Sequence, residues 1–271
     1  MTTTIPTVFI TGANAGLGFE VVKSLLASSK QSYRVLLGGR SFERATEATR
    51  ILTTEHIPSG SRSTVEPVQV DLSSDESIEK AFETVKSKTD RVDVLINNAG
   101  GQFDSYAQDG KMGKREMWNL SWDTNVTGTH LLTEAFAPLL LASSEPRLLF
   151  ITSGTSSIEE ASRGLPYTAA KPPAGWPKPR SYEFTAYRAS KAGLNMVMVE
   201  WKRIFQNDPV KLWAISPGFL ATNLAGVGSD KLKSMGAQDP TVGAEFVRDV
   251  VEGKRDADVG TVIRRDATQA W

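Results

Sequence analysis

Residues 7–26 constrain the fold more than any other part of the chain. A short apolar run at 7–10 leads directly into Thr-Gly-Ala-Asn-Ala-Gly-Leu-Gly at 11–18, and apolar residues then repeat at helical spacing through Leu26. Glycines let a backbone turn tightly and approach a pyrophosphate, whose charge meets the amide groups at the start of a helix. A strand, a glycine turn and a helix in this order predict a dinucleotide-binding loop, against the alternative of an ordinary strand-to-helix turn.

Strands and helices alternate along the rest of the chain. Apolar runs at 34–38, 65–70, 92–96, 147–151, 210–215 and 259–263 predict six further strands, and helices are expected at 42–55, 122–142, 187–205 and 241–252. Residues 101–119 are polar and irregular, and five prolines with Trp176 mark an insertion at about 158–182. This rhythm predicts a single α/β domain over 1–271 with a parallel sheet, whose ligand site lies beyond the carboxyl ends of the strands.

Composition excludes several other kinds of site. The chain has no Cys, and its two histidines, His56 and His130, are isolated, so we expect no metal site. The 31 Lys and Arg balance the 31 Asp and Glu, which gives no net field for nucleic acid. No signal peptide and no membrane span are predicted, because no window approaches ~20 continuous apolar residues. We expect a soluble, cytoplasmic protein.

The second predicted strand ends at Gly39-Arg40. In NAD-binding folds an acidic residue at this point bonds the adenosine ribose hydroxyls. Here no carboxylate is present, and the guanidinium of Arg40 suits a 2′-phosphate, with Arg44 as a helper. The pattern favours NADP(H) over NAD(H), against the alternative of a solvated surface arginine.

Two Tyr-x-x-x-Lys pairs occur, Tyr187 with Lys191 and Tyr167 with Lys171. This spacing places both side chains on one face of a helix, and a nearby ammonium favours the phenolate form of tyrosine, which suits general acid–base catalysis. Two prolines follow Lys171 directly, so no helix continues there, whereas the chain after Lys191 remains helical in character. We therefore choose Tyr187.

Several sequence features, in their order along the chain, resemble the short-chain dehydrogenase/reductase family over essentially the whole chain. They are Thr-Gly-x-x-x-Gly-x-Gly at 11–18, Asp71, Asn-Asn-Ala-Gly at 97–100, Asn125, Ser153, Tyr187 with Lys191, and Pro217-Gly218 with Thr222. Residues 217–226 and the insertion are most similar to monomeric carbonyl reductases, and fungal-type ketoreductases carry comparable insertions. The resemblance implies a Rossmann-type doubly wound sheet of about seven strands, in the order 3-2-1-4-5-6-7, with helices on both faces.

The resemblance also implies direct hydride transfer between a nicotinamide and a carbonyl carbon. Tyr187 would protonate the nascent alkoxide, and Lys191 would lower the pKa of Tyr187 and bond the nicotinamide ribose. Ser153 would hold the carbonyl oxygen, with Thr155 in reserve. Asn125 would anchor a water that links Lys191 to solvent. The structural alternatives are a helix-capping serine for Ser153 and a helix-kink residue for Asn125.

A cofactor-binding set is implied by the same resemblance. The pyrophosphate and ribose would be lined by Gly12, Asn14, Gly16, Leu17 and Gly18. The adenine would be bonded by Asp71, the adenosine side would be flanked by Asn98 and Gly100, and the carboxamide or phosphate would be met by Thr222. The other members of the implied set are Arg40, Ala99, Tyr187, Lys191, Pro217 and Gly218. Ala15 stands where some NADP-binding relatives carry a basic residue, so the NADP(H) prediction rests mainly on Arg40.

The leading hypothesis is NADPH-dependent reduction of a ketone or aldehyde. Its alternatives are an NAD(P)+-dependent alcohol dehydrogenase, a non-redox enzyme of a biosynthetic pathway, and a non-catalytic protein on the same fold, which would have lost the Asn-Ser-Tyr-Lys tetrad. The segments 101–120, 154–182 and 223–238 are expected to build the substrate pocket, and their Phe103, Trp118, Trp176 and Met235 favour a bulky, partly apolar carbonyl compound, unless these side chains pack the insertion. A monomer is favoured over a homo-oligomer, because the insertion lies beside the helix that family members use for association.

Overall fold

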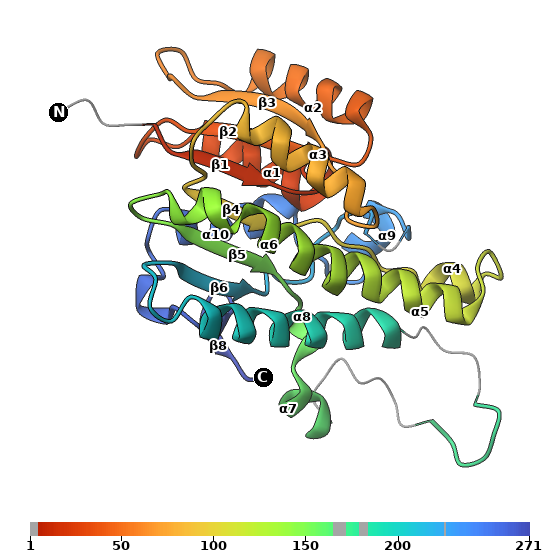
Figure 1. The fold of residues 1–271 in the computed structure, drawn as a ribbon. Coiled ribbons are helices and arrows are strands. Elements are labelled where there is room, and N and C mark those ends of the chain that lie inside the picture. The colour runs from red at the N-terminus through yellow and green to blue at the C-terminus, as the bar shows by residue number, and fades with distance from the viewer. Residues whose placement is uncertain (1–4, 165–171, 179–183, 225) are drawn as a thin grey trace.

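In the part of the chain that the structure describes, eight strands form one sheet in the order β3-β2-β1-β4-β5-β6-β7-β8 (Figure 1). The computed structural model describes residues 5–164, 172–178, 184–224 and 226–271. The strands are β1 (Thr7–Ile10), β2 (Arg34–Gly39), β3 (Thr64–Gln69), β4 (Val94–Asn97), β5 (Arg147–Ile151), β6 (Lys211–Ile215), β7 (Val262–Ile263) and β8 (Thr268–Gln269). All neighbouring pairs are parallel except β7 with β8. The predicted order of seven strands is confirmed, and the antiparallel β8 is an addition.

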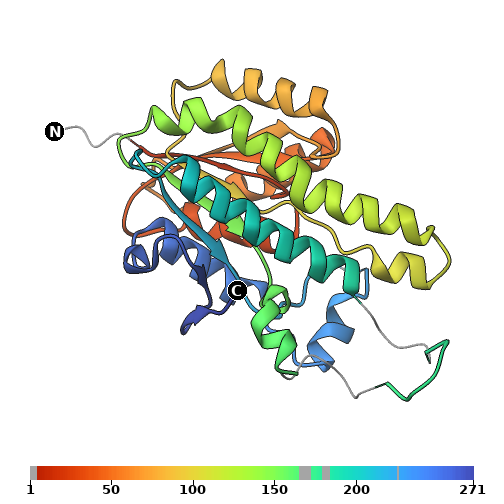
Figure 2. The ribbon, with the colours of Figure 1, turned by 60° about the horizontal axis from the view of Figure 1, so that its bottom comes forward.

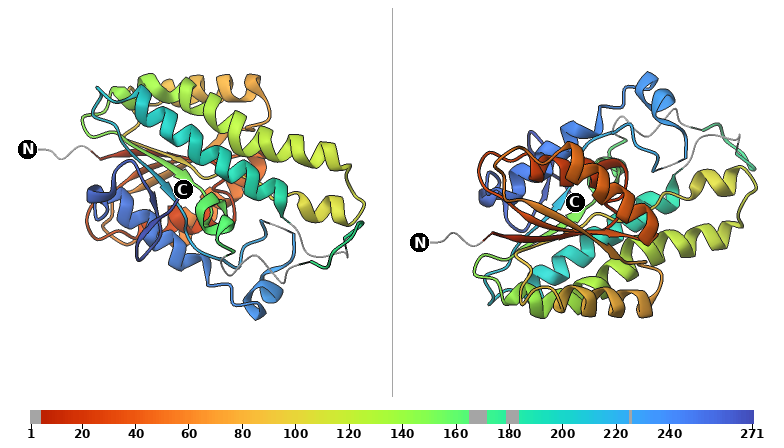
Figure 3. Two further views of the ribbon diagram at one scale, coloured as in Figure 1. Left: turned by 90° about the horizontal axis from the view of Figure 1, so that it is seen from below. Right: turned by 90° about the horizontal axis from the view of Figure 1, so that it is seen from above.

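Helices cover both faces of the sheet, as the two views in Figure 3 show. One face carries α1 (Gly16–Leu26), α2 (Phe42–Glu55) and α10 (Pro240–Val251), and the other carries α3 (Asp75–Lys86), α6 (Gly128–Leu141) and α8 (Thr185–Ile204). Successive strand residues point to opposite faces, so the sheet contributes fully buried side chains to two cores, Trp213 to the first and Phe9 to the second. No described helix combines the length and apolar character that crossing a bilayer requires.

The segment predicted to be irregular, 101–119, is largely helical, and this prediction was wrong. It forms α4 (Asp104–Gln108) and the start of α5 (Lys114–Trp122), which continues through a π-helical segment, η1 (Asp123–Thr127), into α6. The polar composition of α5 reflects a solvent-facing helix whose start is supported by Glu116 Oε2, which accepts from the Gly113 amide at 3.3 Å. In Figure 2 this long helical run lies beside α8 on one face of the sheet.

A short 3-10 turn, η2 (Gly154–Ser156), precedes the insertion, which begins with α7 (Ile158–Ser162). Most of the insertion beyond α7, including the rejected pair Tyr167 and Lys171, lies outside the described residues. Trp176 is 87% exposed, so its side chain does not pack into the described body of the protein. Two further short elements, α9 (Ser229–Ser234) and a 3-10 turn η3 (Asp256–Asp258), lie nearer the C-terminus.

Gly128, the first residue of α6, packs directly against the carbonyl of Leu72. A Cβ atom there would lie 1.9 Å from Leu72 O and 2.8 Å from Leu72 Cβ. Gly128→Ala is therefore expected to lower the free energy of unfolding by about 3 kcal/mol, measured by urea denaturation. The control is Gly113→Ala, whose Cβ meets only Glu116 Oε2 at 3.9 Å and should change stability by less than about 1 kcal/mol. Equal midpoints for the two variants would contradict the packing argument.

Candidate active site

The loop between β1 and α1 exposes glycine backbone and the first amide groups of α1, which no side chain of the preceding residue caps. Gly12 and Gly16 have φ angles of 63° and 57°, a region that disfavours residues with a Cβ. A Cβ on Gly18 would lie 2.5 Å from Asn98 Nδ2 and 2.6 Å from Gly12 O. The residue before α1 is Ala15, which supplies no side-chain cap, so no capping side chain takes up the first amides of the helix. This loop fits the pyrophosphate of a dinucleotide.

The segment after β4 holds the glycine loop in place. Asn98 Nδ2 donates to Thr11 O at 2.8 Å and to Gly12 O at 3.0 Å. In the other direction, Thr11 Oγ1 accepts from the amides of Asn98 and Ala99 at 3.1 and 3.0 Å. The side-chain amide of Asn98 therefore positions the loop, a role that the sequence pattern does not indicate.

Arg40 follows β2 on the side of the glycine loop that the adenosine would occupy. The neighbouring Gly39 is buried, and a Cβ there would lie 3.1 Å from Asn14 Oδ1, so the end of β2 is close to the loop. Arg40 itself is exposed, and among the described residues none forms an ion pair with its guanidinium. Its positive charge is thus available to a ligand.

The remaining predicted cofactor residues lie at strand ends. Asp71 follows β3, and its Oδ1 accepts from the Ser73 amide and hydroxyl at 3.1 and 2.8 Å, which fixes the carboxylate. Across the sheet, Thr222 follows β6 and the Pro217-Gly218 turn. A Cβ on Gly16 would contact Thr222 Cβ and Cγ2 at 3.6 Å, so Thr222 faces the glycine turn. Among the described residues, no three His, Cys, Asp or Glu side chains gather in a way that could hold a metal ion.

Ser153, Tyr187 and Lys191 come together where β5 ends and α8 begins. Tyr187 and Lys191 are both buried and lie one turn apart on α8. The Ser153 side chain is close enough to the Tyr187 phenol to lower its pKa, and Lys191 Nζ donates to Ile151 O at 2.8 Å. Ser153 Oγ also lies 2.9 Å from Thr155 Oγ1. Ser153 Oγ also accepts from the Thr155 amide at 3.2 Å, so the helix-capping role considered as an alternative is present beside its proximity to the phenol.

Asn125, the fourth member of the predicted tetrad, lies in η1 and is fully buried. Its Oδ1 accepts from the Gly101 amide at 2.8 Å, and its Nδ2 donates to Gly101 O and Ser190 Oγ, both at 2.9 Å. A Cβ on Gly100 would lie 2.9 Å from Asn125 Oδ1 and 3.2 Å from Lys191 Nζ. The helix irregularity considered as an alternative is present, as π segments often are at functional sites, and Asn125 nevertheless joins the segment after β4 to α8.

A buried polar network behind Ser153 was not predicted. Thr152 Oγ1 donates to Asn195 Oδ1 at 2.6 Å, and Asn195 Nδ2 donates to Ser156 Oγ at 3.0 Å. Ser156 Oγ in turn donates to Ser153 O at 2.6 Å, and Gln269 Nε2 from β8 reaches the same carbonyl at 3.2 Å. These bonds link β5, α8 and the last strand, and a satisfied network of this kind rigidifies its surroundings.

Burial is the main cause of the pKa shifts of Tyr187 and Lys191. It raises the pKa of Tyr187 to about 12, with the polar Ser153 side chain nearby acting in the opposite direction. It lowers the pKa of Lys191 to about 8. The pKa of Tyr187 is thus raised and not lowered as predicted, because burial penalises the charged phenolate. At neutral pH the phenol is a proton donor.

The lowered pKa of Lys191 predicts a specific pH dependence of stability. Between pH 8 and 10.5 the folded protein has lost a proton that the unfolded chain keeps on this lysine. Stability contributed by this site therefore rises with pH across that window, by up to about 1.4 kcal/mol per pH unit. Lys191→Met removes this gain, so the free energy of unfolding of the wild type should increase relative to the variant between pH 8 and 10.5, measured by urea denaturation.

The control for this series is Lys80→Met, at a side chain that is 74% exposed. This variant is expected to follow the wild type across the same pH range. A constant difference between wild type and Lys191→Met would show that Lys191 is not desolvated as the structure indicates.

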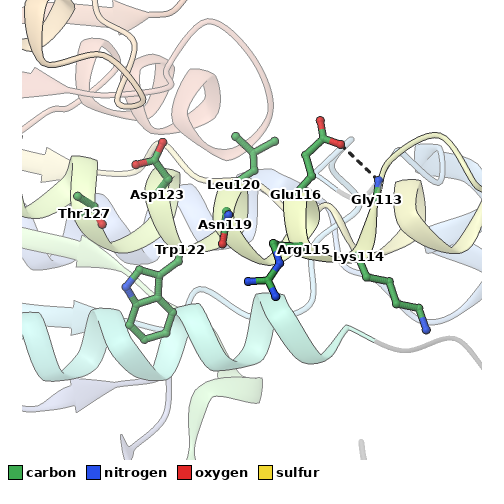
Figure 4. A pocket seen from close by; sticks show the side chains of 9 residues that line it. All are labelled: Gly113, Lys114, Arg115, Glu116, Asn119, Leu120, Trp122, Asp123 and Thr127. Carbon is green, nitrogen blue, oxygen red and sulfur yellow. Dashed lines mark hydrogen bonds between the residues drawn. The ribbon is translucent and has the colours of Figure 1, made fainter.

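A separate hollow of about 1040 Å³ lies along α5 and η1 (Figure 4). Its lining residues are Gly113, Lys114, Arg115, Glu116, Asn119, Leu120, Trp122, Asp123 and Thr127. In Figure 4 the Trp122 ring points toward α8, where a Cβ on Gly193 would lie 2.8 Å from it. Neither the tetrad nor the glycine loop lines this hollow, so it is not the candidate active site.

The fold and the glycine loop define a Rossmann-type dinucleotide-binding α/β protein. Sequence comparison then gives the family, because the family described as "short chain dehydrogenase" matches residues 6–174. "Short-chain dehydrogenase/reductase eupG" from Phoma sp is 47% identical over 274 residues, covering 97% of this chain and 96% of its own. "Short-chain dehydrogenase/reductase tropE" from Talaromyces stipitatus is 44% identical over 259 residues, covering 96% and 95%. The chain belongs to the short-chain dehydrogenase/reductase family of oxidoreductases.

Solved structures agree with this fold. The NADPH-bound carbonyl reductase from chicken fatty liver superposes with a TM-score of 0.76 at 22% identity, covering 98% of this chain and 99% of that one. An actinorhodin polyketide ketoreductase with NADPH gives a TM-score of 0.72 at 19% identity, covering 96% and 95%. At these identities the likeness concerns the fold alone.

Proposed function

We propose that this protein is an NADPH-dependent reductase that converts a ketone or aldehyde into an alcohol. One observation carries the proposal. The buried phenol of Tyr187 lies one helical turn from Lys191 and near the Ser153 side chain, at the same end of the sheet as the glycine loop. A protonated phenol with a hydroxyl beside it suits the carbonyl oxygen of a substrate.

Tyr187, Ser153 and Lys191 have separate roles in the proposed reaction. NADPH held at the glycine loop would supply the hydride to the carbonyl carbon. Tyr187 would donate its proton to the carbonyl oxygen, and Ser153 would bond the same oxygen as negative charge develops on it. Lys191, whose pKa near 8 lies close to neutrality, would restore the proton to Tyr187 and bond the nicotinamide ribose.

Asn125 has a further part in this proposal besides the one that the resemblance implies. Its side-chain amide bonds Gly101 and Ser190, so its side chain would also join the segment after β4 to α8. The effect is to keep Lys191 against Gly100.

The choice of NADPH over NADH rests on Arg40. The end of β2 carries no carboxylate for ribose hydroxyls, and the Arg40 guanidinium is free of ion pairs with the described residues. The chicken carbonyl reductase and the actinorhodin ketoreductase, which share the fold, both hold NADPH.

The test is NADPH oxidation by the purified protein against a panel of ketones, quinones and aldehydes, including bulky and partly apolar members. We expect turnover with at least one class of carbonyl compound and a lower rate with NADH. Turnover of alcohols with NADP+ and of no carbonyl compound would instead support a dehydrogenase. Binding of NADPH without any turnover would support the non-catalytic alternative.

A further inference from the structure

α8, the helix that carries Tyr187 and Lys191, begins without a cap of its own. Phe184 precedes its first residue, and a phenyl ring has no oxygen that could accept from the first amides. Other helices do have local caps: the residues directly before α2, α3, α7 and α10 accept from amides of the first turn through Ser41, Ser74, Ser157 and Asp239. Tyr187 is the third residue of α8, so the phenol stands on the turn that most needs outside acceptors.

Those acceptors come from Asp104, at the start of α4. Asp104 Oδ1 accepts from the Ala186 amide at 2.9 Å, and Oδ2 accepts from the Tyr187 amide at 3.2 Å. The carboxylate is only 4% exposed, and it meets the positive end of the α8 dipole with two charge-assisted hydrogen bonds. We propose that Asp104 is a positioning residue for the reaction, which fixes the backbone of Tyr187 by capping α8 from a segment more than 80 residues earlier in the chain.

The same segment also holds the glycine loop. Asn98 bonds the backbone of Thr11 and Gly12, and Asn125 holds both backbone groups of Gly101. Asp104 stands three residues further on. Residues 98–104 therefore connect the loop that would bind the cofactor to the turn that carries the phenol. Losing the cap would free the start of α8 while leaving the glycine loop tied by Asn98.

The kinetic test compares Asp104→Ala with Asp104→Asn and depends on the proposed function. Asp104→Ala leaves two amides without acceptors, and we expect kcat to fall about 10-fold to 30-fold with the KM for NADPH within about threefold of wild type. Asn keeps one carbonyl oxygen for the cap and should restore kcat to within about threefold of wild type. Asp109→Asn, at an exposed position just after α4, is the matched control and should leave both constants unchanged.

Hydrogen exchange tests the cap without any turnover. In Asp104→Ala the amides of Ala186 and Tyr187 should exchange at least about tenfold faster than in wild type, and those of β5 should not change. Unchanged exchange at these two amides would overturn the cap. Faster exchange with kcat within twofold of wild type would overturn the positioning role. If the wild-type protein reduces no carbonyl, the proposed function and the positioning role fail together, and the exchange result still decides whether Asp104 caps α8.

Discussion

Tyr187→Phe is expected to reduce kcat for carbonyl reduction by a factor of about 10³, because a ring without a hydroxyl cannot donate the proton that quenches the alkoxide. The substitution keeps the ring and its packing at a side chain that is 9% exposed, so the fold should be retained. NADPH binding, measured by fluorescence titration, should stay within about threefold of wild type, because the glycine loop and Arg40 are untouched. The loss would therefore appear in turnover and not in cofactor affinity.

The matched control is Tyr167→Phe, which alters the other Tyr-x-x-x-Lys pair. Tyr167 lies outside the described residues, and its lysine is followed by two prolines. We expect this variant to keep most of the wild-type rate. Retained activity in Tyr187→Phe together with loss in Tyr167→Phe would transfer the acid to the insertion and reject Tyr187 as the proton donor.

The sequence predicts the sheet well because each strand carries its own signal. Buried parallel strands are continuous apolar runs, and the run at 147–151 gives β5 with its observed bounds, as the helical spacing at 42–55 gives α2. The two residues of β8 carry no such signal. They pair with β7 because Gln269 and its neighbours find partners around Ser153, which is a tertiary effect.

The helices between 104 and 122 were missed for a related reason. Their polar residues give little apolar periodicity, and contact with α8 is what orders them. Asp104 bonds the first turn of that helix, and Trp122 packs on Gly193 in its middle. Neither partner can be found from local sequence, because they lie more than 70 residues away in the chain.

At the candidate site, the sequence motifs indicate which residue types come together, whereas the packing of the folded chain decides their protonation states. The order of the tetrad along the chain predicts that Ser153, Tyr187 and Lys191 converge, and they do. Burial reverses the predicted direction of the Tyr187 pKa, since the degree of desolvation depends on packing around α8. The structural role of the Asn98 amide is likewise visible only where β4 meets the glycine loop.

Arg40→Asp is expected to shift the preference for NADPH over NADH, taken as the ratio of kcat/KM values, by about 100-fold toward NADH. The guanidinium is the only basic group at the end of β2 itself, and its replacement by a carboxylate repels a 2′-phosphate while accepting hydrogen bonds from ribose hydroxyls. Most of the change should come from a raised KM for NADPH, because the reacting groups around Tyr187 are not altered.

Because Arg40 is exposed, the effect of Arg40→Asp on cofactor preference can be measured without a large change in stability. The side chain is exposed and forms no ion pair with the described residues, so its loss should leave the thermal midpoint nearly unchanged. Arg44→Asp, on the exposed first turn of α2, reverses a charge of the same kind four residues further along the chain and should shift the ratio by less than about tenfold. An unchanged NADPH-to-NADH ratio in Arg40→Asp would rule out the phosphate contact, whereas an equal shift in both variants would indicate that Arg44 shares that contact.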